Sequence, residues 1–157
     1  MNKPKYVVSA CLAGINCNYK GQSKPCKEVI ELYKKGEALP LCPETLGKLP
    51  VPRQPSEIIN GKAMSKDGRD VTVNFEHGAQ IALAKALASG ARKAIVKSKS
   101  PSCGYQRIYD GSFSKKLCAG NGFWTEKLLK AGFEIYTEEH LQTQSASPTC
   151  QSGKSAS

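Results

Sequence analysis

Hydroxyl and thiol side chains are concentrated in the segment Lys97-Ser98-Lys99-Ser100-Pro101-Ser102-Cys103-Gly104. It directly follows Ala94-Ile95-Val96, a short apolar run that predicts a buried β-strand. Ser100 precedes a proline, which disfavours helical backbone at Ser100, and Pro101 fixes its own φ angle. Gly104 allows the backbone to approach a bulky neighbour closely. A rigid loop that presents a thiol at the end of a strand predicts a functional site.

Two further cysteines follow predicted strands: Cys11 follows the run 6–10, and Cys42 follows the run 38–41. Ligands of parallel sheets bind at the carboxyl ends of the strands, so we expect Cys11, Cys42 and Cys103 to meet there. Three thiolates suit a soft metal or an iron–sulfur cluster. The chain has no C-x-x-C motif. The alternative is that these cysteines are small hydrophobic residues of the core.

Glu44 and Ser100 are the candidate catalytic residues beside these thiols. If the backbone stays extended past Pro43, Glu44 points the same way as Cys42. A carboxylate next to a metal centre can act as a general acid or base. Alternatively, Glu44 caps a helix or faces solvent. Ser100 could exchange a hydrogen bond with a substrate, although a loop serine is often only a turn former.

The chain has 157 residues and a formal net charge of +10, from 23 Lys and Arg against 13 Asp and Glu. This charge favours anionic ligands, but the basic residues are scattered, which argues against nucleic acid as the main partner. No stretch is long enough to span a membrane, and the apolar run at 6–10 is too short for an export signal. We expect a cytoplasmic protein whose seven cysteines stay reduced, and clustered cysteines in that compartment more often serve metal binding or catalysis than disulfides.

Strand and helix patterns alternate along the chain, with apolar runs for the strands and amphipathic spacing for the helices. The predicted strands are 6–10, 38–41, 94–97 and 133–137, and the predicted helices are 23–36, 75–89 and 122–131. This order predicts an α/β fold with a small parallel sheet flanked by helices, Rossmann- or flavodoxin-like. Pro40 indicates an edge position for the second strand. We expect one domain over residues 1–141 and a disordered C-terminal tail over 142–157.

The segments between these elements are predicted loops. The proline-rich stretch 43–55 has no helical pattern, and the polar stretch 61–70 is loop-like or a hairpin. In Tyr109-Asp110-Gly111-Ser112-Phe113, the Asp-Gly pair predicts a tight turn.

Five motifs occur in order along the chain: Ser9-Ala10-Cys11-Leu12-x-Gly14, Cys42-Pro43-Glu44, Pro52-Arg53-x-Pro55, Asp70-Val71-Thr72 and Ser98-Lys99-Ser100-Pro101-Ser102-Cys103-Gly104. Together they resemble the thiouracil desulfidase family. This resemblance implies removal of sulfur from 2- or 4-thiouracil, which gives uracil and hydrogen sulfide. It implies a 4Fe–4S cluster held by Cys11, Cys42 and Cys103, with Glu44 and Ser100 as catalytic residues. The implied partners are a thiolated pyrimidine and the cluster assembly machinery.

Three cysteine ligands for four irons leave one iron open to a substrate sulfur, which predicts a redox-neutral hydrolysis with Glu44 activating water. Cys17, Cys26, Cys118 and Cys150 are predicted not to hold the cluster. Two alternatives stay open: a cluster carrier or redox sensor without its own substrate, and an enzyme that acts on thiolated RNA bases. The sequence departs from the family pattern in loop residues Asn18 and Lys20, and in Lys48, where a second glycine is common.

Overall fold

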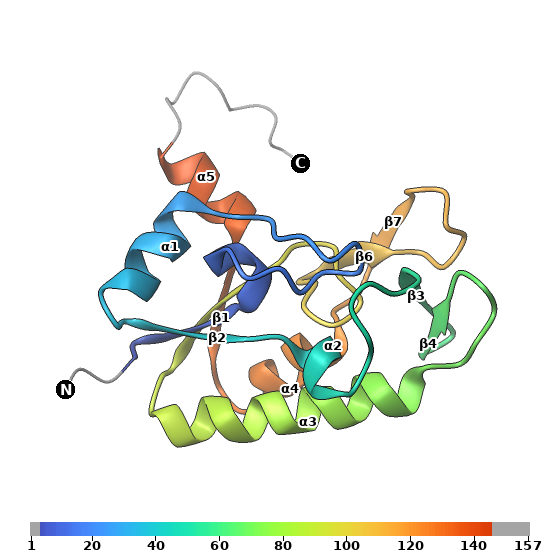
Figure 1. Ribbon diagram of the computed structural model, residues 1–157, viewed down its shortest axis with the longest axis horizontal. Helices are drawn as coiled ribbons and strands as arrows, with labels where there is room; N and C mark the ends of the chain where they lie inside the picture. The colour runs from blue at the N-terminus through green and yellow to red at the C-terminus, as the bar shows by residue number, and fades with distance from the viewer. Residues whose placement is uncertain (1–3, 146–157) are drawn as a thin grey trace.

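A four-stranded parallel sheet forms the centre of the computed structural model, which describes residues 4–145 (Figure 1). Its strands are β1 (Tyr6–Ser9), β2 (Ala38–Leu41), β5 (Lys93–Val96) and β8 (Glu134–Thr137), in the order β2-β1-β5-β8. The chain therefore moves outward from β1 to β2 and then returns to the other side of β1 at β5. The predicted α/β fold is confirmed, and Pro40 does lie on an edge strand.

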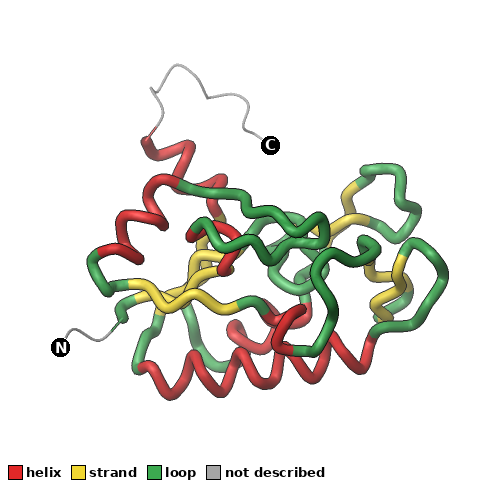
Figure 2. The backbone as a smooth tube through the Cα atoms, viewed as in Figure 1, coloured by secondary structure: helices red, strands yellow, loops and turns green. Residues whose placement is uncertain are grey.

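Helices cover both faces of this sheet (Figures 1 and 2). The helices α1 (Lys27–Lys34) and α5 (Glu138–Ser145) lie on one face, and α3 (Thr72–Ser89) and α4 (Phe123–Lys130) lie on the other. Successive residues of β1 enter different core layers: Val7 packs with alanines of α3, and Val8 packs with Val29 of α1. The pleat of a strand causes this alternation. The result is a three-layer arrangement whose strand ends are free to carry a site.

A short helix, α2 (Pro43–Leu46), lies against α3 with the two backbones in contact. A Cβ atom on Gly78 would overlap the carbonyl oxygen of Pro43, and one on Gly47 would overlap that of Asn74. The Asn74 side chain also donates a 2.8 Å hydrogen bond to the Gly47 carbonyl. Because both glycines lack a side chain, the helices approach closely enough to fix the chain where β2 ends.

Two small antiparallel hairpins extend from one end of the molecule (Figure 2). One pairs β3 (Ser56–Ile59) with β4 (Lys62–Ser65), and the other pairs β6 (Arg107–Tyr109) with β7 (Leu117–Ala119). The predicted hairpin at 61–70 therefore begins earlier, at β3. The predicted tight turn at 109–113 is a longer loop over 110–116, closed by a 2.9 Å hydrogen bond from the Asp110 amide to the Lys116 carbonyl.

Several element boundaries differ from the prediction for identifiable reasons. The first helix begins at Lys27 rather than near Ser23, because the amides of Lys24 and Cys26 instead bind the carbonyls of Cys11 and Leu12. α3 begins at Thr72 rather than residue 75, where the Asp70 carboxylate accepts the Thr72 amide at 2.9 Å.

The C-terminal helix α5 continues to Ser145, past the domain boundary expected at residue 141. The remainder of the predicted tail, 146–157, lies outside the described residues. Over residues 4–145, no helix has both the length and the apolar character needed to cross a membrane.

Candidate active site

A cavity of about 530 Å³ opens at the carboxyl edge of the sheet. Its walls come from the 3-10 helix η1 (Ala10–Ala13), the start of α2, the loop after β5 and both hairpins. All five predicted site residues line it: Cys11, Cys42, Glu44, Ser100 and Cys103. From β1 the chain connects to β2 on one side and later returns to β5 on the other side, so the strand order reverses between β1 and β5. Open α/β sheets bind ligands at the carboxyl ends of the strands beside such a reversal.

Glu44 reaches the cavity by a different route from the one predicted. The extended backbone expected past Pro43 is wrong, because α2 begins at Pro43 and Glu44 lies in its first turn. Proline is favoured at the first helical position, where its missing N–H is not needed. Cys42 occupies the N-cap position of this helix. The end of β2 and the start of α2 therefore place a thiol and a carboxylate on the same cavity wall.

The loop after β5 is held from two helices. The amide and hydroxyl of Ser98 donate to the Glu138 carboxylate of α5 at 2.8 and 2.6 Å. The carbonyls of Pro101 and Ser102 accept the first two amides of α4 at 3.0 and 2.8 Å. Helix amides of the first turn have no partner within their own helix, so these bonds satisfy both segments. The loop is thus fixed at Ser98 and again at Pro101 and Ser102, directly before Cys103.

Ser100 forms the turn that leads to Cys103. Its Oγ accepts the amides of Ser102 and Cys103 at 3.1 and 3.0 Å, as in a turn-forming serine. Its Oγ also lies 3.1 Å from the Ser102 hydroxyl, which donates to Glu44 Oε2 at 2.9 Å. The chain Ser100–Ser102–Glu44 therefore links the two predicted catalytic residues. Ser102 was not among the predicted site residues, although the Ser-Pro-Ser pattern around Pro101 was its signal.

Arg53, like Ser102, was not among the predicted site residues, but it contacts Glu44. Its Nε and Nη2 donate to Glu44 Oε1 at 3.0 and 2.8 Å, and only 7% and 15% of the two side chains are exposed. Nη2 also donates to the Cys17 carbonyl at 3.0 Å. A largely buried charge needs such a partner. The Pro52-Arg53-x-Pro55 motif was its signal, but the motif did not reveal the partner.

The thiols differ in their electrostatic surroundings. Burial raises the pKa of Cys11 to about 12, partly opposed by the nearby Lys97, and burial also raises the pKa of Cys103 to about 12. A hydrogen bond with Cys17 lowers the pKa of Cys42 to about 6 and raises that of Cys17. Bound iron has to replace the thiol proton, and of these thiols Cys42, with its lowered pKa, loses its proton most easily.

The spread of these thiols fits a cluster better than a single metal ion. In the part of the chain that the structure describes, no three Cys, His, Asp or Glu side chains converge as one ion requires. Ligands of a cluster bind different irons, so their sulfur atoms can surround a cavity without meeting at one point. Cys11, Cys42 and Cys103 are free thiols that line one cavity.

The other cysteines lie in three different settings. Cys17 lines the cavity beside Cys42, which the sequence analysis did not anticipate. Cys26 is buried under α1, and Cys118 is exposed on β7. Cys150 lies outside the described residues.

The sequence model of a family described as 2-thiouracil desulfurase matches residues 6–140. The chain belongs to this family. It is 37% identical over 145 residues to "Uncharacterized protein YbbK" of Bacillus subtilis (strain 168), covering 86% of this chain and 96% of that protein. A solved structure, the [4Fe-4S]-dependent thiouracil desulfidase TudS, is 42% identical, with a TM-score of 0.83 over 88% of this chain and 93% of that one.

Two departures from the family pattern have a local explanation. Lys48 has a φ of 69°, a left-handed conformation that glycine adopts without steric cost. Asn18 accepts the amides of Lys20 and Gln22 with its side-chain oxygen at 3.0 and 2.8 Å, so it closes its own loop. Asn18 therefore fits its loop, whereas Lys48 adopts a backbone conformation that favours glycine.

Proposed function

We propose that this protein removes the sulfur atom of a thiolated pyrimidine, 2- or 4-thiouracil, by a hydrolysis that uses a 4Fe–4S cluster. Water and the thiocarbonyl compound give uracil and hydrogen sulfide, with no net electron transfer. Cys11, Cys42 and Cys103 would hold the cluster, and Glu44 and Ser100 would act on the substrate. Family membership and the similarity to TudS support the reaction and the cofactor.

One observation of the structure carries the proposal. Three thiols from separate segments line one cavity together with a carboxylate that is held in place by an arginine. A purely structural set of buried cysteines has no need of a neighbouring ion pair or of an opening to solvent. This arrangement also argues against a cluster carrier, for which Glu44 would have no task.

A bound cluster would supply an iron that has no protein ligand, a Lewis acid suited to a soft thiocarbonyl sulfur. Glu44 takes a proton from the attacking water, and its contact with Arg53 keeps the carboxylate oriented toward the cavity. Ser102 and Ser100 extend the hydrogen bonds of Glu44 across the cavity wall. Lys97 also lines the cavity, and although its Nζ pairs with Glu138 at 3.2 Å, its positive charge contributes to attracting the departing hydrosulfide.

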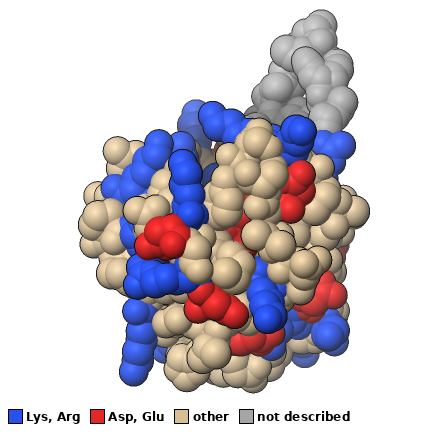
Figure 3. Space-filling view, turned by 90° about the vertical axis from the view of Figure 1, so that its right-hand side faces the viewer, with Lys and Arg blue, Asp and Glu red and all other residues tan. Residues whose placement is uncertain are grey.

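The charge distribution supports a small substrate over an RNA. On the face that carries the two hairpins, acidic side chains lie between the Lys and Arg side chains (Figure 3). Nucleic-acid-binding surfaces instead gather positive charge in a patch or stripe. We further propose a cytoplasmic location, where thiols stay reduced, and delivery of the cluster by the assembly machinery.

The test is anaerobic purification, with iron and sulfide quantified, followed by assays with 2- and 4-thiouracil in isotopically labelled water. We expect turnover without an added reductant, labelled oxygen in the uracil, and one sulfide released per uracil. A requirement for a stoichiometric electron donor, or absence of the label from the product, would overturn the hydrolytic mechanism. An iron-containing protein that is inactive on every thiolated pyrimidine would favour the carrier or sensor.

A further inference from the structure

The β6–β7 loop is fastened to the other hairpin by a single carboxylate. Glu57 of β3 has only 9% of its surface exposed, and its Oε1 accepts the amides of Gly111 and Phe113 at 2.9 and 3.0 Å. Gly111 has a φ of 95°, and a Cβ atom there would overlap the Ile59 side chain. The two hairpins are therefore in contact at a position where no residue larger than glycine fits. The two hydrogen bonds that Glu57 accepts there are called the clasp below.

This clasp holds Phe113 in an unusual backbone conformation. Phe113 has a φ of 57°, which is rare for a bulky residue and persists only where the surroundings enforce it. Its side chain is half-buried and lines the cavity together with Tyr109. No other ring within residues 4–145 pairs with it. Phe113 thus lines the cavity without an aromatic partner among the described residues.

We infer that Phe113 is a substrate-binding residue that stacks on a planar thiocarbonyl heterocycle, and that Glu57 is the residue that positions it. This inference rests on the proposed function, because the same cavity holds the thiols and Glu44. Stacking on an aromatic ring tolerates different ring substituents, since every pyrimidine has a π-face. Stacking would orient the pyrimidine ring, and the polar side chains that line the cavity would then determine whether a 2-thio or a 4-thio group is accepted.

The experiment compares two matched pairs of variants in the cluster-loaded protein. Phe113→Leu removes the ring and Phe113→Tyr keeps it, whereas Glu57→Ala removes the clasp and Glu57→Gln keeps an oxygen that can accept both amides. Tyr33→Leu removes an exposed ring on α1 as a control. The probes are 2-thiouracil for turnover and uracil for binding, because uracil has no sulfur to lose.

For Phe113→Leu we expect KM for 2-thiouracil and Kd for uracil to rise by about five- to hundredfold, the range for loss of ring stacking, with kcat little changed. Glu57→Ala should reproduce this effect, and the double variant should be no worse than either single one, since both act through one ring. The conservative variants Phe113→Tyr and Glu57→Gln should recover most of the affinity that Phe113→Leu and Glu57→Ala lose, and Tyr33→Leu should match the unmodified protein.

Hydrogen exchange tests the clasp without any turnover. Glu57→Ala should speed exchange of the Gly111 and Phe113 amides, whereas Glu57→Gln should leave it slow. Unchanged KM and uracil affinity in Phe113→Leu would overturn the inference and leave the proposed function intact. Failure of the unmodified protein to convert thiouracil would overturn the proposed function and this inference with it. Unchanged exchange in Glu57→Ala would remove only the positioning role of Glu57.

Discussion

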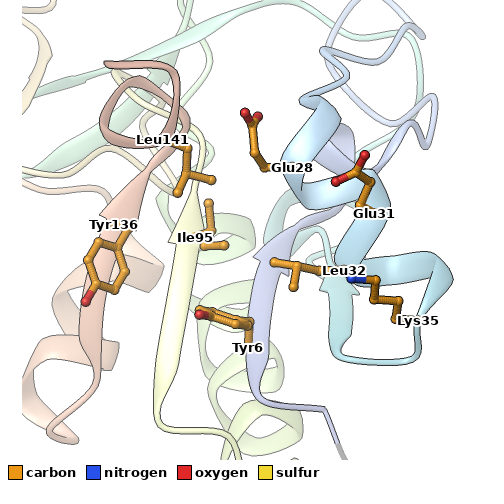
Figure 4. A pocket seen from close by; sticks show the side chains of 8 residues that line it. All are labelled: Tyr6, Glu28, Glu31, Leu32, Lys35, Ile95, Tyr136 and Leu141. Carbon is orange, nitrogen blue, oxygen red and sulfur yellow. The ribbon is translucent and has the colours of Figure 1, made fainter. Parts of the chain in front are cut away.

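Two cavities lie against the same sheet, and only one of them contains reactive groups. The cavity at the carboxyl edge is lined by thiols, hydroxyls and an ion-paired carboxylate. The second, of about 390 Å³, lies between α1 and α5 over the sheet face (Figure 4). Its lining includes the apolar side chains Leu32 and Ile95 and two tyrosines, and its charged groups come from α1. No cysteine or serine is among its lining residues.

The difference follows from where each cavity sits relative to the strands. Residues over a sheet face alternate between two packed layers, so Ile95 must be apolar for the sheet to be covered. Residues beyond the strand ends are free of that requirement. Cys42 and Ser100 occupy such positions, where the chain can carry reactive groups without exposing the core. Comparable volume therefore does not imply comparable function.

The largest expected effect is on the iron content of the protein, which cysteine replacements in the cavity at the carboxyl edge should lower. Serine in place of Cys11, Cys42 or Cys103 should give colourless, iron-poor protein, measured by iron and sulfide content after anaerobic purification. These variants should also be less soluble, because metal binding contributes to folding. Cys17→Ser and Cys118→Ser should keep the iron. Full iron content after one of the first three replacements would remove that residue from the ligand set.

The next difference concerns the carboxylates. Glu44→Gln keeps the shape of the side chain but removes the base, so turnover of thiouracil should fall by at least ~100-fold while the iron content stays normal. The matched control is Glu31→Gln, the same change in the lining of the second cavity, which should leave turnover unchanged. Near-normal turnover in Glu44→Gln would make the carboxylate structural and remove the base from the mechanism.

The smallest difference concerns serines that close turns. Ser100→Ala should lower turnover by about tenfold, since it loses hydrogen bonds of about 1 kcal/mol each beside Cys103. Ser89 also closes a turn by accepting a backbone amide, from Ala91 at 3.1 Å, but lies at the end of α3 outside both cavities. Ser89→Ala should leave turnover unchanged, as a kinetic assay on both variants would show. Equal effects would assign Ser100 a purely structural role.

The strand-end cysteines could be predicted because a parallel sheet brings carboxyl ends together whatever the loops do. Their meeting in one cavity follows from topology. The edge position of β2 was predicted from Pro40, which cannot donate a hydrogen bond to a neighbouring strand. Glu44 does line the cavity beside Cys42, but the extended backbone from which this was predicted is wrong. A proline at the end of a strand can also begin a helix, as Pro43 does here.

The contacts made by Arg53, Ser102 and Glu57 could not be predicted, because each joins separate elements: Glu44 lies 9 residues from Arg53 and 58 from Ser102, and Gly111 lies 54 from Glu57. Local patterns report periodicity and turn chemistry, and neither specifies which carboxylate an arginine will meet. The start of the first helix shows the same limit. Its boundary depends on amides of residues 24 and 26 binding carbonyls of η1, which no pattern around Ser23 records.

The glycine contact between α2 and α3 restricts which substitutions this sequence can accept. Glycine in a helix interior is less stable than alanine by about 1 kcal/mol, so replacing Gly78 should improve α3 taken alone. A methyl group there would instead push α2 away and move Cys42 and Glu44 with it. Val73 on the same helix is 80% exposed and can change freely. One helix thus combines a position open to almost any residue with one where a single extra carbon would disarrange the wall of the cavity.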